Sequence, residues 1–147
     1  MTIKSFRGKL ADLGIDTIPL RTNNGSTGYK IKTFQVMTGD EIGTVETANL
    51  VAIYSVPQTN AVGTADFNDN TLLAAADYRQ HDNEAYGNTA NVIVFDNMKF
   101  NQDIYVTNFD RNSGGSMNYY IELEVMNLDL SENTVATLKD IRNIAGQ

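Results

Sequence analysis

The sequence lacks cysteine and tryptophan, and it contains only two prolines and one histidine. Without cysteine, disulfides, thiolate catalysis, Cys-ligated zinc and iron–sulfur clusters are excluded. The single histidine, His81, lies beside Asp82 in a polar segment, and no nucleophile-elbow motif marks a partner serine. His81 is therefore interpreted as a solvated loop residue. Phosphate-binding glycine loops and dinucleotide fingerprints are also absent, so we expect a protein that is not an enzyme and has no cofactor.

Positive charge is scarce as well. The 11 Lys and Arg residues are scattered along the chain against 18 Asp and Glu, which gives a net charge of −7. Because nucleic-acid binding needs a clustered positive surface, that class of function is not expected. Apolar runs fall far short of the roughly 20 residues that a membrane helix requires, and "MTIKSFRGKLADLG" lacks the apolar core of a signal peptide. We therefore expect a soluble protein without a membrane partner.

Alternating polar and apolar residues dominate the chain. The length fits one domain, residues 1–147, and the 17 asparagines and 15 threonines suit turns and polar strand faces. Predicted strands lie at 17–22, 28–37, 49–56, 71–78, 91–96, 103–109 and 117–130. Short strands at fairly regular spacing predict an all-β fold, a single antiparallel β-sandwich of the jelly-roll-like kind with about seven to nine strands.

Two features of the strand pattern predict local geometry. The segment "NNGSTG" at 23–28 carries an Asn-Gly turn signal, so 17–37 is predicted to form a hairpin. It contains the only glycosylation triplet, which begins at Asn24 and is interpreted as part of the turn. The apolar side changes parity near Thr33 and again at Met126–Asn127, which predicts a bulge or bend at each place.

The two ends of the chain differ in character from the middle. Residues 1–10 are expected to form an N-terminal arm whose Ile3 and Phe6 dock on a neighbouring subunit, because large apolar side chains are costly to expose. Residues 131–147 begin with Ser131, a good N-cap, and carry apolar residues at helical spacing. They are expected to form a short C-terminal helix or a tail.

Glu122 and Glu124 form the most suggestive carboxylate pair. Alternate residues on a strand lie about 6.6–6.8 Å apart at Cα, which is compatible with carboxyl separations of roughly 5–9.5 Å in glycosidases. Two parallel side chains on one strand seldom flank a substrate bond from both sides, however. The pair is therefore interpreted as the polar face of a strand, bounded by Tyr120 and Met126, and as an assembly contact.

A weak calcium candidate lies at Asp66, Asn68 and Asn70, which match the start of a D-x-[DN]-x-[DN] loop. Thr71 replaces the glycine needed at the sixth place, and Asp77 replaces the bidentate glutamate at the twelfth. The segment is therefore interpreted as an Asx-rich turn, and no metal is expected.

Several stretches resemble small virion structural proteins of marine tailed phages, notably those that infect cyanobacteria. These stretches are "IKSFRGKLAD", "GYKIKTFQVM", "FNQDIYVTNFD" and "MNYYIELEVMNLDLSENTVATLKDIRNI". The resemblance covers about two-thirds of the chain and implies a component of the virus particle, assembled in the host cytoplasm. It carries over no catalytic residues and does not distinguish head from tail.

The leading hypothesis is a non-enzymatic head decoration or cement protein that braces subunits of the major capsid protein. A homo-oligomer is expected, with a trimer matching a local symmetry axis of the shell. The expected interface residues are Ile3, Phe6, Tyr120, Glu122, Glu124 and Met126.

Three alternatives remain open. The first is a tail or baseplate component. The second is a carbohydrate-binding or host receptor-binding module that would use tyrosines for stacking, namely Tyr29, Tyr54, Tyr86, Tyr105 and Tyr120. The third is a glycosidase that would use Glu122 and Glu124.

Overall fold

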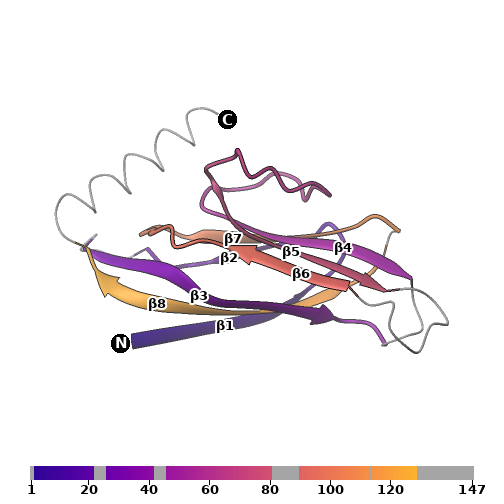
Figure 1. Cartoon of the computed structure of the whole chain (residues 1–147), viewed down its shortest axis with the longest axis horizontal. Helices are drawn as coiled ribbons and strands as arrows, with labels where there is room; N and C mark the ends of the chain where they lie inside the picture. Colours follow the sequence, from indigo (N-terminus) through magenta and orange to yellow (C-terminus); the bar gives the residue numbers. More distant parts are fainter. Residues whose placement is uncertain (1, 22–25, 42–45, 81–89, 113, 129–147) are drawn as a thin grey trace.

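The computed structural model describes residues 2–21, 26–41, 46–80, 90–112 and 114–128 (Figure 1). Within these residues eight strands form two antiparallel sheets that pack face to face. The strands are β1 (Thr2–Leu10), β2 (Ile15–Ile18), β3 (Thr27–Thr38), β4 (Thr47–Tyr54), β5 (Leu72–Gln80), β6 (Ala90–Phe95), β7 (Ile104–Asp110) and β8 (Met117–Asn127). The predicted all-β sandwich is confirmed. The helix or tail expected at 131–147 lies outside the described residues.

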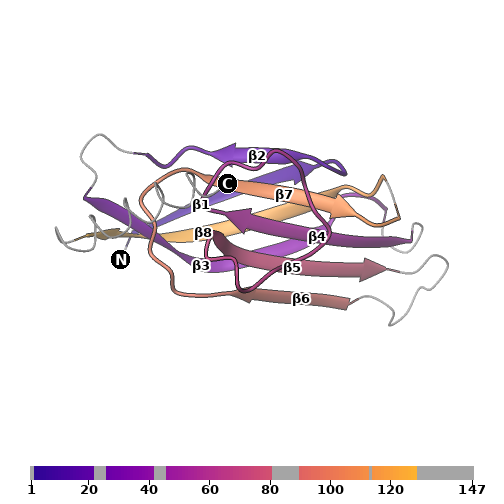
Figure 2. The same ribbon diagram turned by 90° about the horizontal axis from the view of Figure 1, so that it is seen from above.

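The strand order is that of a jelly roll with one departure. One sheet has the order β1-β8-β3, and the other has the order β2-β7-β4-β5-β6 (Figure 2). The nested pairs β1/β8, β2/β7 and β4/β5 wind the chain as a jelly roll does. The remaining nested pair, β3 with β6, is not formed because β6 pairs with β5 instead. Both β3 and β6 are therefore sheet edges.

The predicted hairpin at 17–37 is wrong. β2 pairs with β7 in one sheet and β3 pairs with β8 in the other, so the chain crosses between the sheets after β2. The backbone N–H groups of Leu20 and Arg21 donate to Asp103 Oδ1 at 2.9 and 3.0 Å. Ile18 and Leu20 point into the core. Alternation revealed that these residues are buried, but it could not reveal which strand they pair with.

The bulge predicted near Thr33 is confirmed. The β3–β8 register shifts between Ile31 and Thr33, which leaves Lys32 as the extra residue. This shift lets Ile31, Phe34 and Val36 all face the core despite their mixed parity.

The second predicted bulge, at Met126–Asn127, is wrong. These residues pair in regular register with Gly28 and Thr27. Leu128 keeps the parity of Met126 and packs over Gly28, where an added Cβ would lie only 2.6 Å from the Leu128 side chain. Leu128 therefore lies on the same side of the sheet as Met126, and no register shift precedes it. Its side chain is buried against Gly28, outside the main core.

Residues 2–10 form an edge strand rather than an arm. β1 pairs with β8 from Thr2 to Leu10 without a register shift. Phe6 faces inward and packs against the core, while Ile3 lies on the opposite side of the strand. Lys4 and Gly8 share the inward side with Phe6, whereas Ile3 is outward, so the apolar residues do not alternate and the sequence did not predict a strand here.

The core lies between the two sheets, and side chains from both sheets contribute to it. At one end Tyr29 stacks on Phe100 with ring centroids 6.2 Å apart, and its hydroxyl donates to the Leu20 carbonyl. Burying each large apolar side chain contributes roughly 1.5–3 kcal/mol. The largest fully buried apolar side chains are Tyr29, Phe34, Val51, Ile53, Val56, Ile104, Val106, Met117, Ile121 and Leu123.

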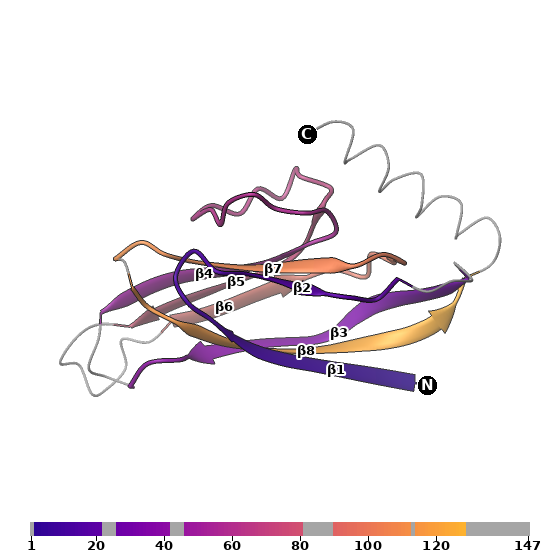
Figure 3. The same cartoon turned by 180° about the vertical axis from the view of Figure 1, so that it is seen from behind.

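The outer face of the five-stranded sheet is covered by the connection between β4 and β5. Residues 55–71 run above this sheet (Figure 3). Ala52, Tyr54 and Leu72 form a small second apolar cluster, and Gly63 lies close against the Phe109 ring. Among the described residues, the outer face of the three-stranded sheet has no such covering connection (Figures 1 and 3).

Candidate functional site

The candidate site is the outer face of the three-stranded sheet, which we call the β8 face. Antiparallel partners share a face of the sheet, so the register identifies its members from the even-numbered residues of β8. The residues of the β8 face are Ile3, Ser5, Arg7, Lys9, Gly28, Lys30, Thr33, Gln35, Met37, Asn118, Tyr120, Glu122, Glu124 and Met126.

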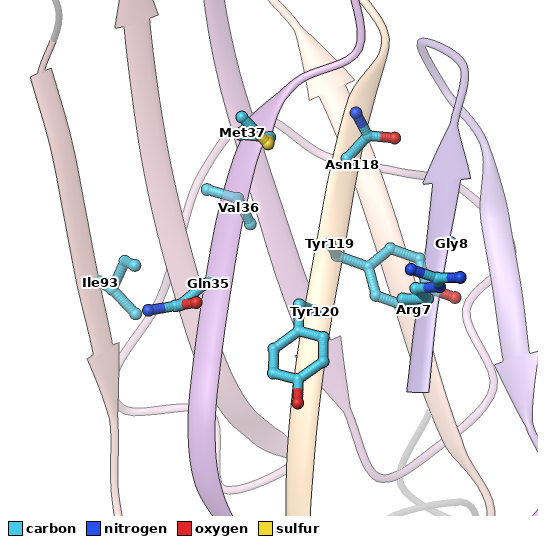
Figure 4. A pocket seen from close by; sticks show the side chains of 9 residues that line it. All are labelled: Arg7, Gly8, Gln35, Val36, Met37, Ile93, Asn118, Tyr119 and Tyr120. Atoms are coloured by element: carbon cyan, nitrogen blue, oxygen red, sulfur yellow. The ribbon is translucent and has the colours of Figure 1, made fainter. Parts of the chain in front are cut away.

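A groove of about 840 Å³ is lined partly by this face and partly by inward-facing residues, among them Ile93 of β6 in the other sheet (Figure 4). Tyr120 lies at its centre, with its register partners Arg7 on one side and Gln35 on the other. Met37 pairs with Asn118 farther along the strand. Met37 is 57% exposed and Tyr120 is 36% exposed. The groove is lined by Arg7, Gly8, Gln35, Val36, Met37, Ile93, Asn118, Tyr119 and Tyr120.

Two hydrogen bonds fix side chains that support the groove. Tyr119 points away from Tyr120 into the sandwich, where its hydroxyl donates to Asp16 Oδ2 at 2.8 Å. This bond joins the two sheets, and burial together with the Asp16 carboxylate raises the pKa of Tyr119. The Asn118 side-chain amide donates to the Thr38 carbonyl at 3.2 Å. The groove is therefore built on fixed side chains and presents a preformed surface.

Gly8 allows the Tyr119 ring to take this position. A Cβ on Gly8 would lie 2.7 Å from the Tyr119 hydroxyl oxygen and 2.9 Å from the ring. Any larger residue would displace the ring from Asp16. The glycine is thus part of what holds the groove in shape.

Glu122 and Glu124 lie on the β8 face beside the groove, as the alternation predicted. Glu124 forms an ion pair with Lys30 at 3.3 Å, and both groups are partly exposed. Glu122 pairs in register with Ser5 and Thr33. Such an exposed ion pair contributes about 0–1 kcal/mol. Both carboxylates project from one strand on the same side, whereas glycoside hydrolysis needs carboxyl groups on both sides of the bond.

The structure brings five of the six expected interface residues to one face. Those on the β8 face are Ile3, Tyr120, Glu122, Glu124 and Met126. Phe6 does not join them, because it packs inward against the core.

The calcium candidate lies in the connection that covers the other sheet. Asp66, Asn68 and Asn70 are exposed, and the Asp66 Oδ1 accepts the N–H of Asn68 at 2.9 Å. Asp69 Oδ1 similarly accepts the N–H and hydroxyl of Thr71. These are the bonds of Asx turns. In the described residues, no three His, Cys, Asp or Glu side chains gather in an arrangement that would hold a metal ion.

The five tyrosines considered for stacking are dispersed. Tyr29 and Tyr54 are buried, and Tyr105 is half-buried on the other sheet. Tyr120 alone among the described four borders the groove. Tyr86, His81 and the triplet residue Asn24 lie outside the described residues.

Sequence reasoning missed most neighbours of Tyr120. Arg7 belongs to the segment expected to be an arm, and Gln35 and Met37 follow the bulge that changes the parity of β3. A pairing register is needed to place these residues beside Tyr120, and the alternation in a single strand does not contain it. The one available signal was the parity change near Thr33, which puts Gln35 and Met37 on the polar side of the strand pattern.

A scan against protein-family models finds no match, and searches of curated proteins and of solved structures find no similar protein. In the described part of the chain, no helix has the length and apolar character needed to cross a membrane. The function therefore has to be inferred from the chemistry of the β8 face.

Proposed function

We propose that the chain is a non-enzymatic structural protein of a phage particle, a head decoration protein that docks its β8 face on the major capsid protein. The observation that carries this proposal is the exposed set of Tyr120, Met37 and Arg7 around one preformed groove. Tyrosine, methionine and arginine are enriched at protein interfaces, and tyrosine and arginine dominate their hot spots.

The chemistry of the groove favours binding over catalysis. Its nine lining residues include no Asp, Glu, His, Ser, Thr or Lys. These are the side chains used most often in general acid–base and nucleophilic catalysis, and tyrosine is the one other type with such roles that lines the groove. Amides and an arginine beside an aromatic ring are suited instead to recognising another surface.

A decoration role would use many copies of a modest contact. Stable interfaces bury about 1,200–2,000 Å² in total, and several linked copies strengthen attachment without new contacts. We infer a homo-oligomer on the shell, for which a trimer is one closed arrangement. The resemblance to virion structural proteins of cyanobacterial phages supports a place in the particle.

Two alternatives predict different outcomes. A tail or baseplate component would use the same β8 face for a different virion partner. A carbohydrate-binding or host receptor-binding module is favoured by one observation, the placement of Tyr120 between Gln35 and Arg7, because an aromatic ring flanked by polar groups can hold a sugar. Immunogold labelling of particles distinguishes head from tail, and glycan-array binding that requires Tyr120 would favour the receptor module.

Incorporation of Tyr120→Ala and Arg7→Glu variants into particles tests the proposal. We expect either change to lower occupancy at least about 30-fold at limiting protein, since a hot-spot side chain contributes about 2 kcal/mol or more. Phe67→Ala is the matched control, because Phe67 is 69% exposed in the connection above the other sheet. Quantitative mass spectrometry of purified particles gives the occupancy. Wild-type incorporation of both β8-face variants, with both shown to be folded, would contradict the proposal.

A further inference from the structure

Among the described residues, β6 forms one edge of the five-stranded sheet. It pairs with β5 on one side, and no other described strand lies along its other side (Figure 2). In an antiparallel edge strand, alternate N–H and C=O groups point away from the sheet and can pair with another strand. Proteins usually guard such edges against unwanted association.

The other three edges of the sandwich carry recognised protection. β1 carries Lys4, Arg7 and Lys9 along its length. β2 is only four residues long. β3 is interrupted by the bulge at Lys32, two residues after Lys30. Charge, shortness and bulging are the means by which natural sheets prevent edge pairing.

β6 has none of these features. Its sequence, Ala-Asn-Val-Ile-Val-Phe, contains no charge and no proline, and its register with β5 is uninterrupted. Val92 is 60% exposed, Val94 is 45% exposed and Phe95 is 37% exposed. A regular, apolar, uncharged edge of this kind is suited to pairing with another strand.

We propose that β6 pairs antiparallel with β6 of a second copy of this chain, about a twofold axis at Ile93, and joins the two five-stranded sheets into one. In this register Ile93 meets its own copy, and Val92 meets Val94 of the second copy. Pairs of β-branched residues across antiparallel strands are favourable. In the joined sheet, the inner face of one copy is continuous with the inner face of the second copy, and the same holds for the outer faces.

The sequence of β6 favours a second copy at this place, because Val92-Ile93-Val94 is symmetric about Ile93 and the same pairs form on both sides of a twofold axis. Each chain carries a net charge of −7, so two copies repel one another over most of their surface. β6 is an uncharged strip on which two such chains can approach without placing like charges together. The inference does not depend on the virion assignment. It predicts a twofold dimer rather than the trimer expected from a shell symmetry axis.

Cysteine cross-linking tests the register, because the chain has no cysteine of its own. We expect Ile93→Cys to form an intermolecular disulfide under mild oxidation, since Cα atoms within about 7 Å can be bridged. Val92→Cys and Val94→Cys should cross-link weakly alone and strongly when mixed with each other. Val62→Cys, at an exposed loop valine, is the control for random collision. Cross-linking at Ile93 no faster than at Val62 would overturn the proposed pairing.

Sedimentation velocity tests the association itself on the full chain. We expect a dimer at about 100 μM, well above a dissociation constant of about 1 μM. Val94→Lys should weaken the dimer at least about tenfold, because it places like charges on the paired edge, while Val62→Lys should leave it unchanged. Circular dichroism confirms that both variants are folded. A wild-type monomer or trimer, or a dimer that tolerates Val94→Lys, would overturn the inference.

Discussion

Tyr119 and Tyr120 are neighbours in the sequence, but they serve opposite faces of one strand. Tyr120 is exposed at the centre of the groove, whereas Tyr119 reaches through the sandwich to Asp16. Strand alternation requires this division of roles. A substitution at Tyr120 should therefore affect binding to a partner, whereas one at Tyr119 should affect the stability of the fold.

Tyr119→Phe is expected to destabilise the fold by about 1–3 kcal/mol at pH 7, because it removes the hydrogen bond to Asp16 and leaves the carboxylate short of a donor. Tyr120→Phe, which changes only an exposed hydroxyl, should stay within about 0.5 kcal/mol of wild type. Urea unfolding measures both. Equal losses in the two variants would contradict the bridging role of Tyr119.

The raised pKa of Tyr119 also predicts a pH dependence. The neutral phenol is favoured in the folded state, so its contribution is fully present below about pH 10, the ordinary pKa of tyrosine. Above that pH the unfolded chain loses the proton first, and stability falls. The difference between wild type and Tyr119→Phe should therefore shrink above about pH 10. Burial also raises the pKa of Tyr54 and Tyr78, so part of the alkaline loss should remain in the variant.

Leu13 holds an unfavourable backbone conformation in the turn between β1 and β2. Its φ is 65°, and its side chain is 59% exposed, so little burial offsets the strain. Asparagine tolerates this region better than leucine does, whereas a β-branched residue tolerates it worse. We expect Leu13→Asn to stabilise the protein by about 0.5–1 kcal/mol and Leu13→Ile to destabilise it. Thermal unfolding that ranks the two variants in the opposite order would contradict this reading of the turn.

For the strands, the periodicity of the sequence predicted which side chains are buried better than it predicted which strands pair. It identified the strand that became β8 and placed Tyr120, Glu122, Glu124 and Met126 on one face. It also identified the bulge in β3. It wrongly predicted that β2 and β3 pair as a hairpin, and it did not predict that β1 pairs with β8. Partners of a strand are set by the whole topology, and a single strand's pattern does not record them.

The crossing after β2 depends on one carboxylate. Asp103 Oδ1 accepts two consecutive backbone N–H groups, those of Leu20 and Arg21. We expect Asp103→Ala to destabilise the protein by about 1–3 kcal/mol, because it leaves both donors without this acceptor, and Asp103→Asn to cost less. Hydrogen exchange should accelerate at these two amides in Asp103→Ala. Unchanged exchange there would show that the crossing is held by other contacts.

At the scale of the whole molecule, the sandwich presents two different surfaces. The departure of β6 from β3 leaves an apolar edge, and the uncovered three-stranded sheet leaves the β8 face. The opposite face is covered by residues 55–71. A protein with one open face for a partner and one edge for its own copy is suited to repeated assembly.

Cryo-electron microscopy of particles that contain the protein tests whether the β8 face docks on the major capsid protein. We expect density for the sandwich on the head, with the β8 face and Tyr120 against a major capsid subunit. Density on the tail, or a sandwich whose β8 face points to solvent, would contradict it.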